Sequence, residues 1–192
     1  VYRAGGRIDP TMPYIASQQA TVQASDSLTF AMAMPTTRPA GDVYIALSAK
    51  NGNNRVTPPA GWTEYADLQQ HAAYYKEGTD AGGGNEAASY TWTVATTAEQ
   101  WSGVILRIKG FNTGSPISGT AGTGDNGGAA GVPLLPNTGS VPTHDATLVI
   151  RAAGINADAP SDYTWLPNGH TKVYSGVSTA GGGAATASLV SM

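Results

Sequence analysis

Hydrophobic and polar residues alternate in a short stretch that begins near residue 27. In residues 27–34 every even-numbered side chain is large and apolar, which is the period of a strand with one buried face. Residues 43–47 are apolar almost without a break, and such a run between turns predicts a strand in a central position. Apolar residues keep helical spacing nowhere for more than a turn or two. The pattern therefore predicts an all-β chain.

Further strands are expected where short apolar or alternating runs lie between turn residues. They are residues 21–23, 62–68, 72–76, 89–94 and 104–108. Composition agrees, because the 192 residues include 25 Gly and 12 Pro, whereas charged residues are only 12%, about half the usual share. A chain of this length and composition predicts one antiparallel β-sandwich domain.

One supersecondary unit occurs twice. Residues 42–63 hold an apolar strand, a polar loop and a P-x-G-x-T motif, and residues 145–171 repeat this order, beginning with a strand at 145–153. Each copy continues into an extended stretch and a triple glycine, at 82–84 and 181–183. Matched order at matched spacing predicts two related halves packed as one sandwich.

The second copy lacks a counterpart of the strand at 104–108, which closes the first. An open sheet edge at that place would be a liability, because its main-chain groups are free to pair with another chain. We therefore expect a continuation of the chain, or a strand from a neighbouring subunit, to complete the second half.

Two segments lie outside the predicted strands. Residues 1–18 place prolines and glycines where they disfavour helix and central strand, and this predicts an extended N-terminal arm before a sandwich over 19–192. Residues 111–142 form a Gly-rich connection between the halves, about 19–110 and 143–192. For the arm, a disordered tail and a segment ordered against a neighbouring subunit stay open. For the connection, a mobile linker and a contact surface stay open.

Candidate contact residues lie in the arm and in one loop. The arm residues that we expect to touch other subunits are Tyr2, Arg3, Arg7, Ile8 and Tyr14. Trp165 lies in the loop before the second P-x-G-x-T motif, and it is the candidate platform for a ligand such as a glycan. Three other aromatic residues, Trp62, Trp92 and Tyr65, are assigned to packing.

Charge and cysteine content argue against several partners. The net charge is −3 and the ten basic residues are scattered, which argues against nucleic-acid binding through the backbone. Cysteine is absent, so the chain has neither disulfides nor thiolate metal ligands. No run of eighteen apolar residues occurs, and we therefore expect no membrane insertion.

The residues offer little catalytic chemistry. His71, His144 and His170 are far apart and lack metal-ligand spacing, and nothing positions Ser, His and Asp as a triad. The nearest carboxylate pairs lie at turns, where Asp and Glu commonly serve as solvated caps; they are Glu64 with Asp67, Glu77 with Asp80, and Asp158 with Asp162. We expect no catalytic residues, no metal and no cofactor.

A family resemblance rests on one motif and on the order of the strands around it. Residues 56–63 read V-T-P-P-A-G-W-T, and Tyr90-Thr91-Trp92 follows at strand spacing before the apolar run at 104–110. From about residue 19 to its end the chain resembles a β-sandwich module of bacteriophage virion proteins, also seen in secreted bacterial proteins. The resemblance implies a jelly-roll-like architecture and a place in a tail fibre, spike or capsid decoration. It implies no catalytic residues.

These observations together predict a non-enzymatic structural protein of a virion surface, of the tail fibre or capsid decoration type. It would assemble with other virion subunits, as a homo-oligomer, through its arm and strand edges, and it could share in host attachment. The alternative is a glycan- or receptor-binding module of a secreted or cell-surface bacterial protein. Both functions place the chain on a virion surface or outside the cell.

Overall fold

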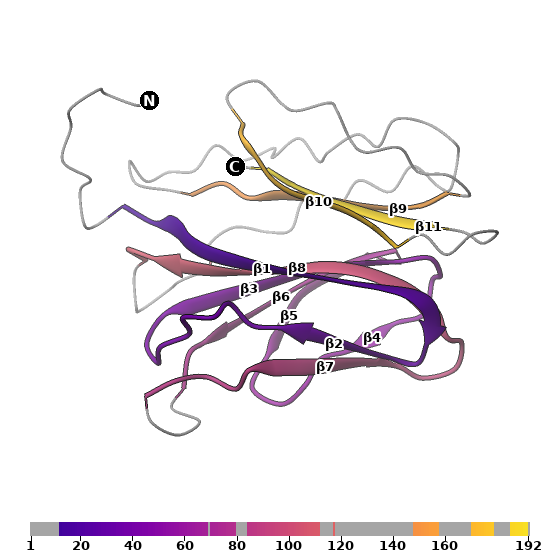
Figure 1. Ribbon diagram of the computed structural model, residues 1–192, viewed down its shortest axis with the longest axis horizontal. Helices are drawn as coiled ribbons and strands as arrows, with labels where there is room; N and C mark the ends of the chain where they lie inside the picture. Colours follow the sequence, from indigo (N-terminus) through magenta and orange to yellow (C-terminus); the bar gives the residue numbers. More distant parts are fainter. Residues whose placement is uncertain are drawn as a thin grey trace.

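The chain folds into three stacked antiparallel β-sheets (Figure 1). This computed structural model describes residues 12–68, 70–79, 84–111, 117, 148–157, 170–178 and 185–191. Within these ranges every regular element is a strand. The predicted all-β, antiparallel sandwich is therefore confirmed.

The middle sheet has five strands, and the predicted central strand lies at its centre. Its order is β1 (Tyr14–Ser27), β8 (Glu99–Lys109), β3 (Val43–Lys50), β6 (His71–Glu77) and β5 (Thr63–Leu68). The lower sheet of Figure 1 has the order β2 (Thr29–Ala33), β7 (Ser89–Val94) and β4 (Val56–Thr57). Because β3 is covered on both faces and both edges, its residues are nearly all buried, which explains their continuous apolar character.

The upper sheet contains the strands after residue 150. Its order is β10 (Lys172–Ser178), β11 (Ala185–Ser191) and β9 (Arg151–Ala157), and it lies over the outer face of the middle sheet (Figure 1). In the predicted duplication β7 and β11 are counterparts, because each follows a triple glycine. β11 pairs with β9 on one side and with β10 on the other. β7, in contrast, lies in a different sheet from β3. The jelly-roll connection and the relation between the two halves stay predictions.

An aromatic core fills the space between the middle and lower sheets. The rings of Phe30 and Trp101 stack with centroids 5.4 Å apart, and those of Trp62 and Trp92 meet edge to face at 5.1 Å. Trp62 and Trp92 are buried, so their predicted role in packing is confirmed. Tyr65, the third residue assigned to packing, lies at a register shift in β5 and is 37% exposed, so it lies outside the aromatic core.

A second, aliphatic core joins the middle and upper sheets. Its buried side chains come from β3 and β8: Val43, Leu47, Val104, Leu106 and Ile108. Leu148 and Ile150 pack against them from the segment just before β9. Strand β8 therefore contributes to both cores, since its even-numbered residues face the upper sheet and its odd-numbered Trp101 and Ile105 face the lower one.

Two predicted boundaries are corrected by the strand pairing. β1 begins at Tyr14, inside the predicted arm, because residues 14–18 already pair with the end of β8. The strand predicted at 145–153 begins only at Arg151 and continues to Ala157, through the start of the predicted polar loop. There, pairing with β11 outweighs the polar character of Asn156 and provides its main-chain partners.

Gly154 permits the close approach of the upper sheet to the middle one. A Cβ atom at this position would lie 2.7 Å from the Cβ of Ala49 and 2.9 Å from the carbonyl oxygen of Gln70. We expect Gly154→Val to cost about 1–3 kcal/mol through overpacking and to loosen the upper sheet selectively. Hydrogen exchange should rise in β9 and β10 but not in β7. The matched control Ala31→Val changes an exposed strand position and should leave exchange unchanged; uniform loss of protection in the Gly154 variant would contradict the prediction.

Candidate functional site

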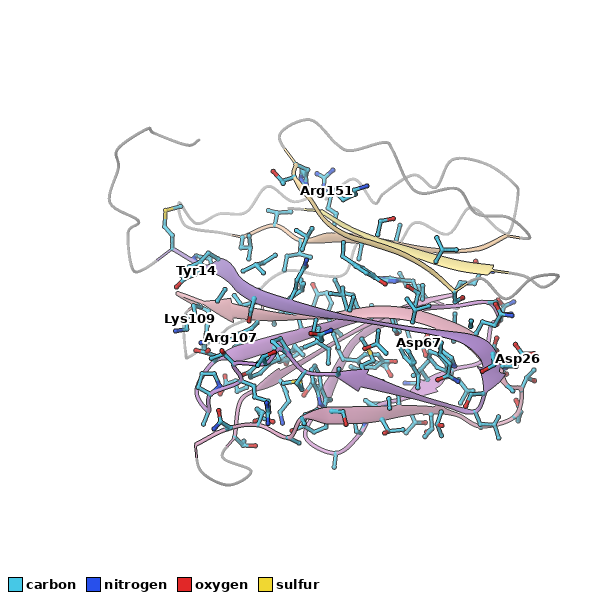
Figure 2. The ribbon with its side chains drawn as sticks, in the orientation of Figure 1. Tyr14, Asp26, Asp67, Arg107, Lys109 and Arg151 are labelled. Atoms are coloured by element: carbon cyan, nitrogen blue, oxygen red, sulfur yellow. The ribbon has the colours of Figure 1, made fainter. Side chains whose placement is uncertain are left out.

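The first candidate site is the free edge of the middle sheet formed by β1. This strand pairs with β8 on one side, and no strand of the described residues pairs with its other side. Residues 14–25 contain neither a charge nor a proline, and Asp26 is the first charged residue after them. Tyr14 and Asp26 lie at opposite ends of the strand (Figure 2). Natural edge strands usually carry charges, prolines or bulges that discourage pairing. The register of β1 against β8 shifts between Ile15 and Ser17 and between Gln23 and Ser27, so the edge is both neutral and regular over residues 17–23.

Exposed apolar side chains gather along the same strand. The structure has five large exposed hydrophobic residues within its described ranges, and four of them lie in or next to β1: Met12 (47% exposed), Tyr14 (41%), Val22 (48%) and Leu28 (45%). Single exposed apolar residues need no explanation. Their concentration on one edge marks a surface suited to contact with another protein.

Side-chain hydrogen bonds hold β1 against both neighbouring sheets. Above it, the Nε2 atom of Gln18 donates to the carbonyl oxygen of Val173 at 2.9 Å. Below it, the main-chain N–H of Ala33 donates to the Oγ1 atom of Thr21 at 3.1 Å. The edge is thus presented by a strand that is anchored at both faces, which reduces the entropy lost when a partner binds.

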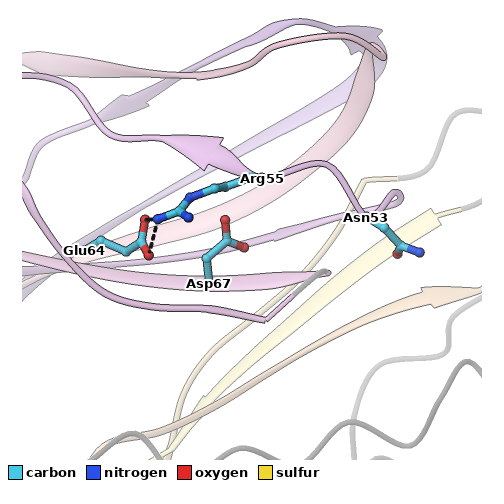
Figure 3. Close-up of a pocket in the computed structure, with 4 residues that line it drawn as sticks. All are labelled: Asn53, Arg55, Glu64 and Asp67. Carbon is cyan, nitrogen blue, oxygen red and sulfur yellow. Dashed lines mark hydrogen bonds and ion pairs between the residues drawn. The ribbon is translucent and has the colours of Figure 1, made fainter.

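The second candidate site is a polar pocket of about 230 Å³ at the opposite side of the molecule's middle sheet. Asn53 and Arg55 enter it from the loop between β3 and β4, and Glu64 and Asp67 enter it from β5 (Figure 3). The Nη2 atom of Arg55 lies 3.1 Å from both carboxylate oxygens of Glu64. The pocket therefore offers hydrogen-bond donors and acceptors side by side, but its own charges are largely paired.

Buried polar contacts fix the loop that forms this pocket. The side-chain oxygen Oδ1 of Asn51 accepts a bond from the main chain of Gln100 at 2.8 Å. Asn54 donates to the buried carboxylate of Glu99 at 2.8 Å. The buried Nζ of Lys50 donates to the carbonyl oxygen of Gly52 at 3.0 Å. Burial lowers the pKa of Lys50, while the negative charges of Asp67 and Glu99 oppose that change.

The pocket brings together one of the carboxylate pairs considered from the sequence. Glu64 binds the Arg55 guanidinium, and the Oδ2 atom of Asp67 accepts a bond from the main-chain N–H of Val56 at 2.9 Å. Both carboxylates thus hold the loop and the start of β4 in place. Their assignment to structure rather than catalysis stays a prediction. Of the other two carboxylate pairs, only Glu77 lies within the described residues. The remaining members, Asp80, Asp158 and Asp162, lie outside them.

A separate buried polar cluster lies beneath the P-P-A-G-W segment, residues 58–62. The Nζ atom of Lys76 lies 2.6 Å from a carboxylate oxygen of Glu86 and 2.8 Å from the hydroxyl of Tyr90. Tyr90 and the main-chain N–H of Thr79 also donate to Glu86. Gly61, with φ +83°, brings the main chain over the ammonium group. Every charge in this cluster is paired, so it stabilises the fold around the motif that carries the family resemblance.

The histidines and acidic residues of the described ranges form no group of three that could hold a metal ion. His71 lies on β6, His170 precedes β10, and His144 lies outside those ranges. Burial lowers the pKa of His71 to about 4, a hydrogen bond with the Ser48 main chain opposes this change, and the positive charge of Lys50 adds to it.

The lowered pKa of His71 predicts that the folded chain loses stability in mild acid. The unfolded chain binds a proton at His71 below the ordinary pKa of 6.5, whereas the folded chain does so only near 4. Stability should therefore be full above 6.5 and fall by about 2 kcal/mol as the pH is lowered to about 5. Urea unfolding above pH 6.5 and near pH 5 measures this difference in the free energy of unfolding. His71→Gln cannot titrate, and an equal loss in that variant would show that other groups cause it.

The structure separates the contact residues proposed from the sequence. Tyr14 begins β1 and is exposed at the edge described above. Tyr2, Arg3, Arg7, Ile8 and Trp165 lie outside the described residues. Sequence reasoning did not single out the edge of β1 or the residues Asn53 and Arg55. The neutral run 14–25 and the polar loop 51–55 were the signals that could have located them.

Comparison with known proteins adds no relative. A scan against protein-family models, a search of the curated proteins and a search of the solved structures find nothing that matches the chain. Among the described residues no helix has the length and apolar character required to cross a membrane. The resemblance to bacteriophage virion modules therefore remains a prediction from the motif at residues 56–63.

Proposed function

We propose that this chain is a non-enzymatic structural protein of a virion surface, of the tail fibre or capsid decoration type. In this proposal it assembles with copies of itself through its N-terminal segment and its strand edges. The observation that carries the proposal is the long, uncharged and partly apolar edge of β1, which has the character of a surface that another chain covers. The resemblance of residues 56–63 to virion modules supplies the virion context.

Two further observations support an assembled structural role. Three layers share two cores, which make a stiff support for surface contacts. The buried charges Lys76 and Glu86 are paired with each other, and Arg107 is paired with Asp42, so these groups serve the fold. A rigid sandwich with an edge strand that no other described strand pairs with is suited to repeated packing in a symmetric particle.

Light scattering of the purified full chain tests the assembly. We expect a mass of at least two chains at micromolar concentration without any ligand. Removal of residues 1–11 leaves β1 whole and should weaken the assembly, because the predicted arm contacts Tyr2, Arg3, Arg7 and Ile8 are lost. A monomer at every concentration contradicts the proposal.

Immunogold electron microscopy tests the place of the chain in the particle. Antibodies against the chain should label the surface of intact virions that contain it. Label that appears only after the particles are disrupted would contradict a surface role. Copurification of the chain with non-viral cell envelopes would favour the alternative, a secreted or cell-surface bacterial module.

The polar pocket favours one second candidate function, recognition of a glycan or receptor. Paired donors and acceptors in Asn53, Arg55, Glu64 and Asp67 are the groups that bind sugar hydroxyls in a small cleft. A glycan array probed with the natural chain should then give hits that Arg55→Ala removes. Thr91→Ala, on an exposed face of β7, serves as the control. Absence of any hit with the natural chain contradicts this candidate.

A further inference from the structure

We propose that two copies of this chain pair through their β1 strands, antiparallel and about a two-fold axis, so that two middle sheets become one continuous ten-stranded sheet. This inference rests on the proposed assembly and adds its partner, surface and symmetry. The partner is a second copy of the chain, and the contact is main-chain pairing along residues 17–23, the regular part of β1.

The neutral composition of β1 allows it to pair with itself. An antiparallel two-fold contact sets each residue against a residue of the same strand, so a charged strand would place like charges opposite each other. Between Tyr14 and Ser25 there is no charge. A pairing centred on Ala20 sets Gln18 of one copy against Val22 of the other, and Ser17 against Gln23. Polar amides and small or apolar side chains meet, and no charge is buried.

Other sheet edges carry more protection than residues 17–23, the regular part of β1 between its two register shifts. At the opposite edge of the middle sheet, β5 carries Glu64 and Asp67 and has a bulge, which are features that discourage edge pairing. In the lower sheet, β4 has only two residues and β2 has five. β1, with 14 residues, is the longest edge in the part of the chain that the structure describes.

The exposed apolar residues favour a protein partner on this edge. Val22 lies in the middle of the strand, Tyr14 lies at its start, and both are more than two-fifths exposed. A second β1 strand alongside would remove part of these side chains from water, in addition to pairing the free main-chain groups. Because β1 is tied to β10 and β2, little reordering is needed on binding.

Cysteine cross-linking tests the proposed geometry. The natural chain contains no cysteine, so a single Ala20→Cys variant reports only on position 20. Opposed residues of an antiparallel pair have Cα atoms about 4.5–5.5 Å apart, which is within the range of a disulfide. Under mild oxidation we expect a disulfide-linked dimer by intact mass, at least tenfold faster than for Thr91→Cys. Thr91 is also exposed but lies on the central strand of the lower sheet.

Charge substitution provides a second test that does not require a disulfide to form. Ala20→Lys and Ala20→Glu should each weaken self-association at least tenfold in light scattering, because like charges then face each other. An equimolar mixture of the two variants should restore dimers. Thr91→Lys adds the same charge elsewhere and should leave the association unchanged. Thermal unfolding of each variant shows whether the monomer is still folded.

The outcomes separate this inference from the proposed function. If the full chain assembles but Ala20→Cys does not cross-link and the charged variants associate normally, the β1 contact is wrong and assembly occurs elsewhere. If the natural chain is a monomer throughout, both proposals fail. Dimers that are lost in the single charged variants and restored in their mixture establish the contact.

Discussion

Glu86→Ala is expected to destabilise the fold by about 3–5 kcal/mol, because it leaves a buried ammonium without its counter-charge. The side chains of Lys76 and Glu86 are 4% and 0% exposed, with Nζ and Oε2 2.6 Å apart. The same carboxylate also accepts bonds from Tyr90 and Thr79. Urea unfolding followed by tryptophan fluorescence measures the loss.

Two variants test whether the large expected loss of stability is due to the burial of the Lys76–Glu86 pair or to the loss of an ion pair alone. Arg55→Ala breaks a pair of the same chemistry at the surface and should cost less than about 1 kcal/mol. Lys76→Met combined with Glu86→Gln removes both charges and keeps a hydrogen-bonding group at position 86. It should cost less than the sum of the single changes. Equal losses for the surface and the buried pair would contradict this explanation.

The pKa shifts of Lys76 and Glu86 predict how the stability of the fold depends on pH at the acidic and the basic end. Burial by itself would raise the pKa of Glu86, but its bonds with Lys76, Tyr90 and Thr79 hold it below the ordinary 4.5. Burial by itself would lower the pKa of Lys76, but its bonds with Glu86 and Tyr90 hold it above 10.5. The stabilisation is therefore present between these limits. It is lost as the pH falls through the pKa of Glu86 or rises through that of Lys76.

Trp92→Ala is the second change with a large expected effect, a loss of about 3–5 kcal/mol. Trp92 is fully buried on β7, directly opposite Phe30 on β2. Its ring centroid lies 5.1 Å from that of Trp62 and 5.9 Å from that of Tyr74. Truncation removes these contacts and leaves a cavity between the middle and lower sheets. Denaturant midpoints and near-ultraviolet circular dichroism measure the loss of stability and of aromatic packing.

A graded series identifies packing as the cause. The Nε1 atom of Trp92 has no hydrogen-bond partner among the described residues, so Trp92→Phe removes an unpaired buried donor and keeps most of the ring contacts. Its cost should be about half that of Trp92→Ala or less. Thr91→Ala changes the exposed neighbour and should stay within about 0.5 kcal/mol of the natural chain. A Phe variant as unstable as the Ala variant would point to a specific role of the indole nitrogen.

Much of the fold could be predicted because a strand produces a recognisable pattern among residues that are neighbours in the sequence. Alternation at residues 27–34 predicted one exposed and one buried face, and Phe30 and Met32 are buried while Ala31 is exposed. The continuous apolar run at 43–47 predicted the central position of β3. In the first case the pattern has the two-residue period that a pleated strand with one buried face imposes. In the second the alternation is absent, because both faces of the strand are covered.

The candidate sites depended on which distant strands become neighbours. Residues 14–25 are ordinary neutral residues in the sequence, and they become a candidate interface only because β1 lies at the edge of its sheet. Arg55 and Asp67 come from different elements and meet only when β4 and β5 are placed.

The sequence by itself determined the all-β class, the burial of Trp62 and Trp92, and most strands of the middle and lower sheets, but not the short β4 or the full length of β1. Tertiary structure alone decided the order of strands in each sheet, the third layer, the pairing of Lys76 with Glu86 and the free edge of β1. The physical reason is that a side-chain period reflects neighbours along the chain. Sheet order and ion pairing instead depend on contacts between residues far apart in sequence, which no local pattern specifies.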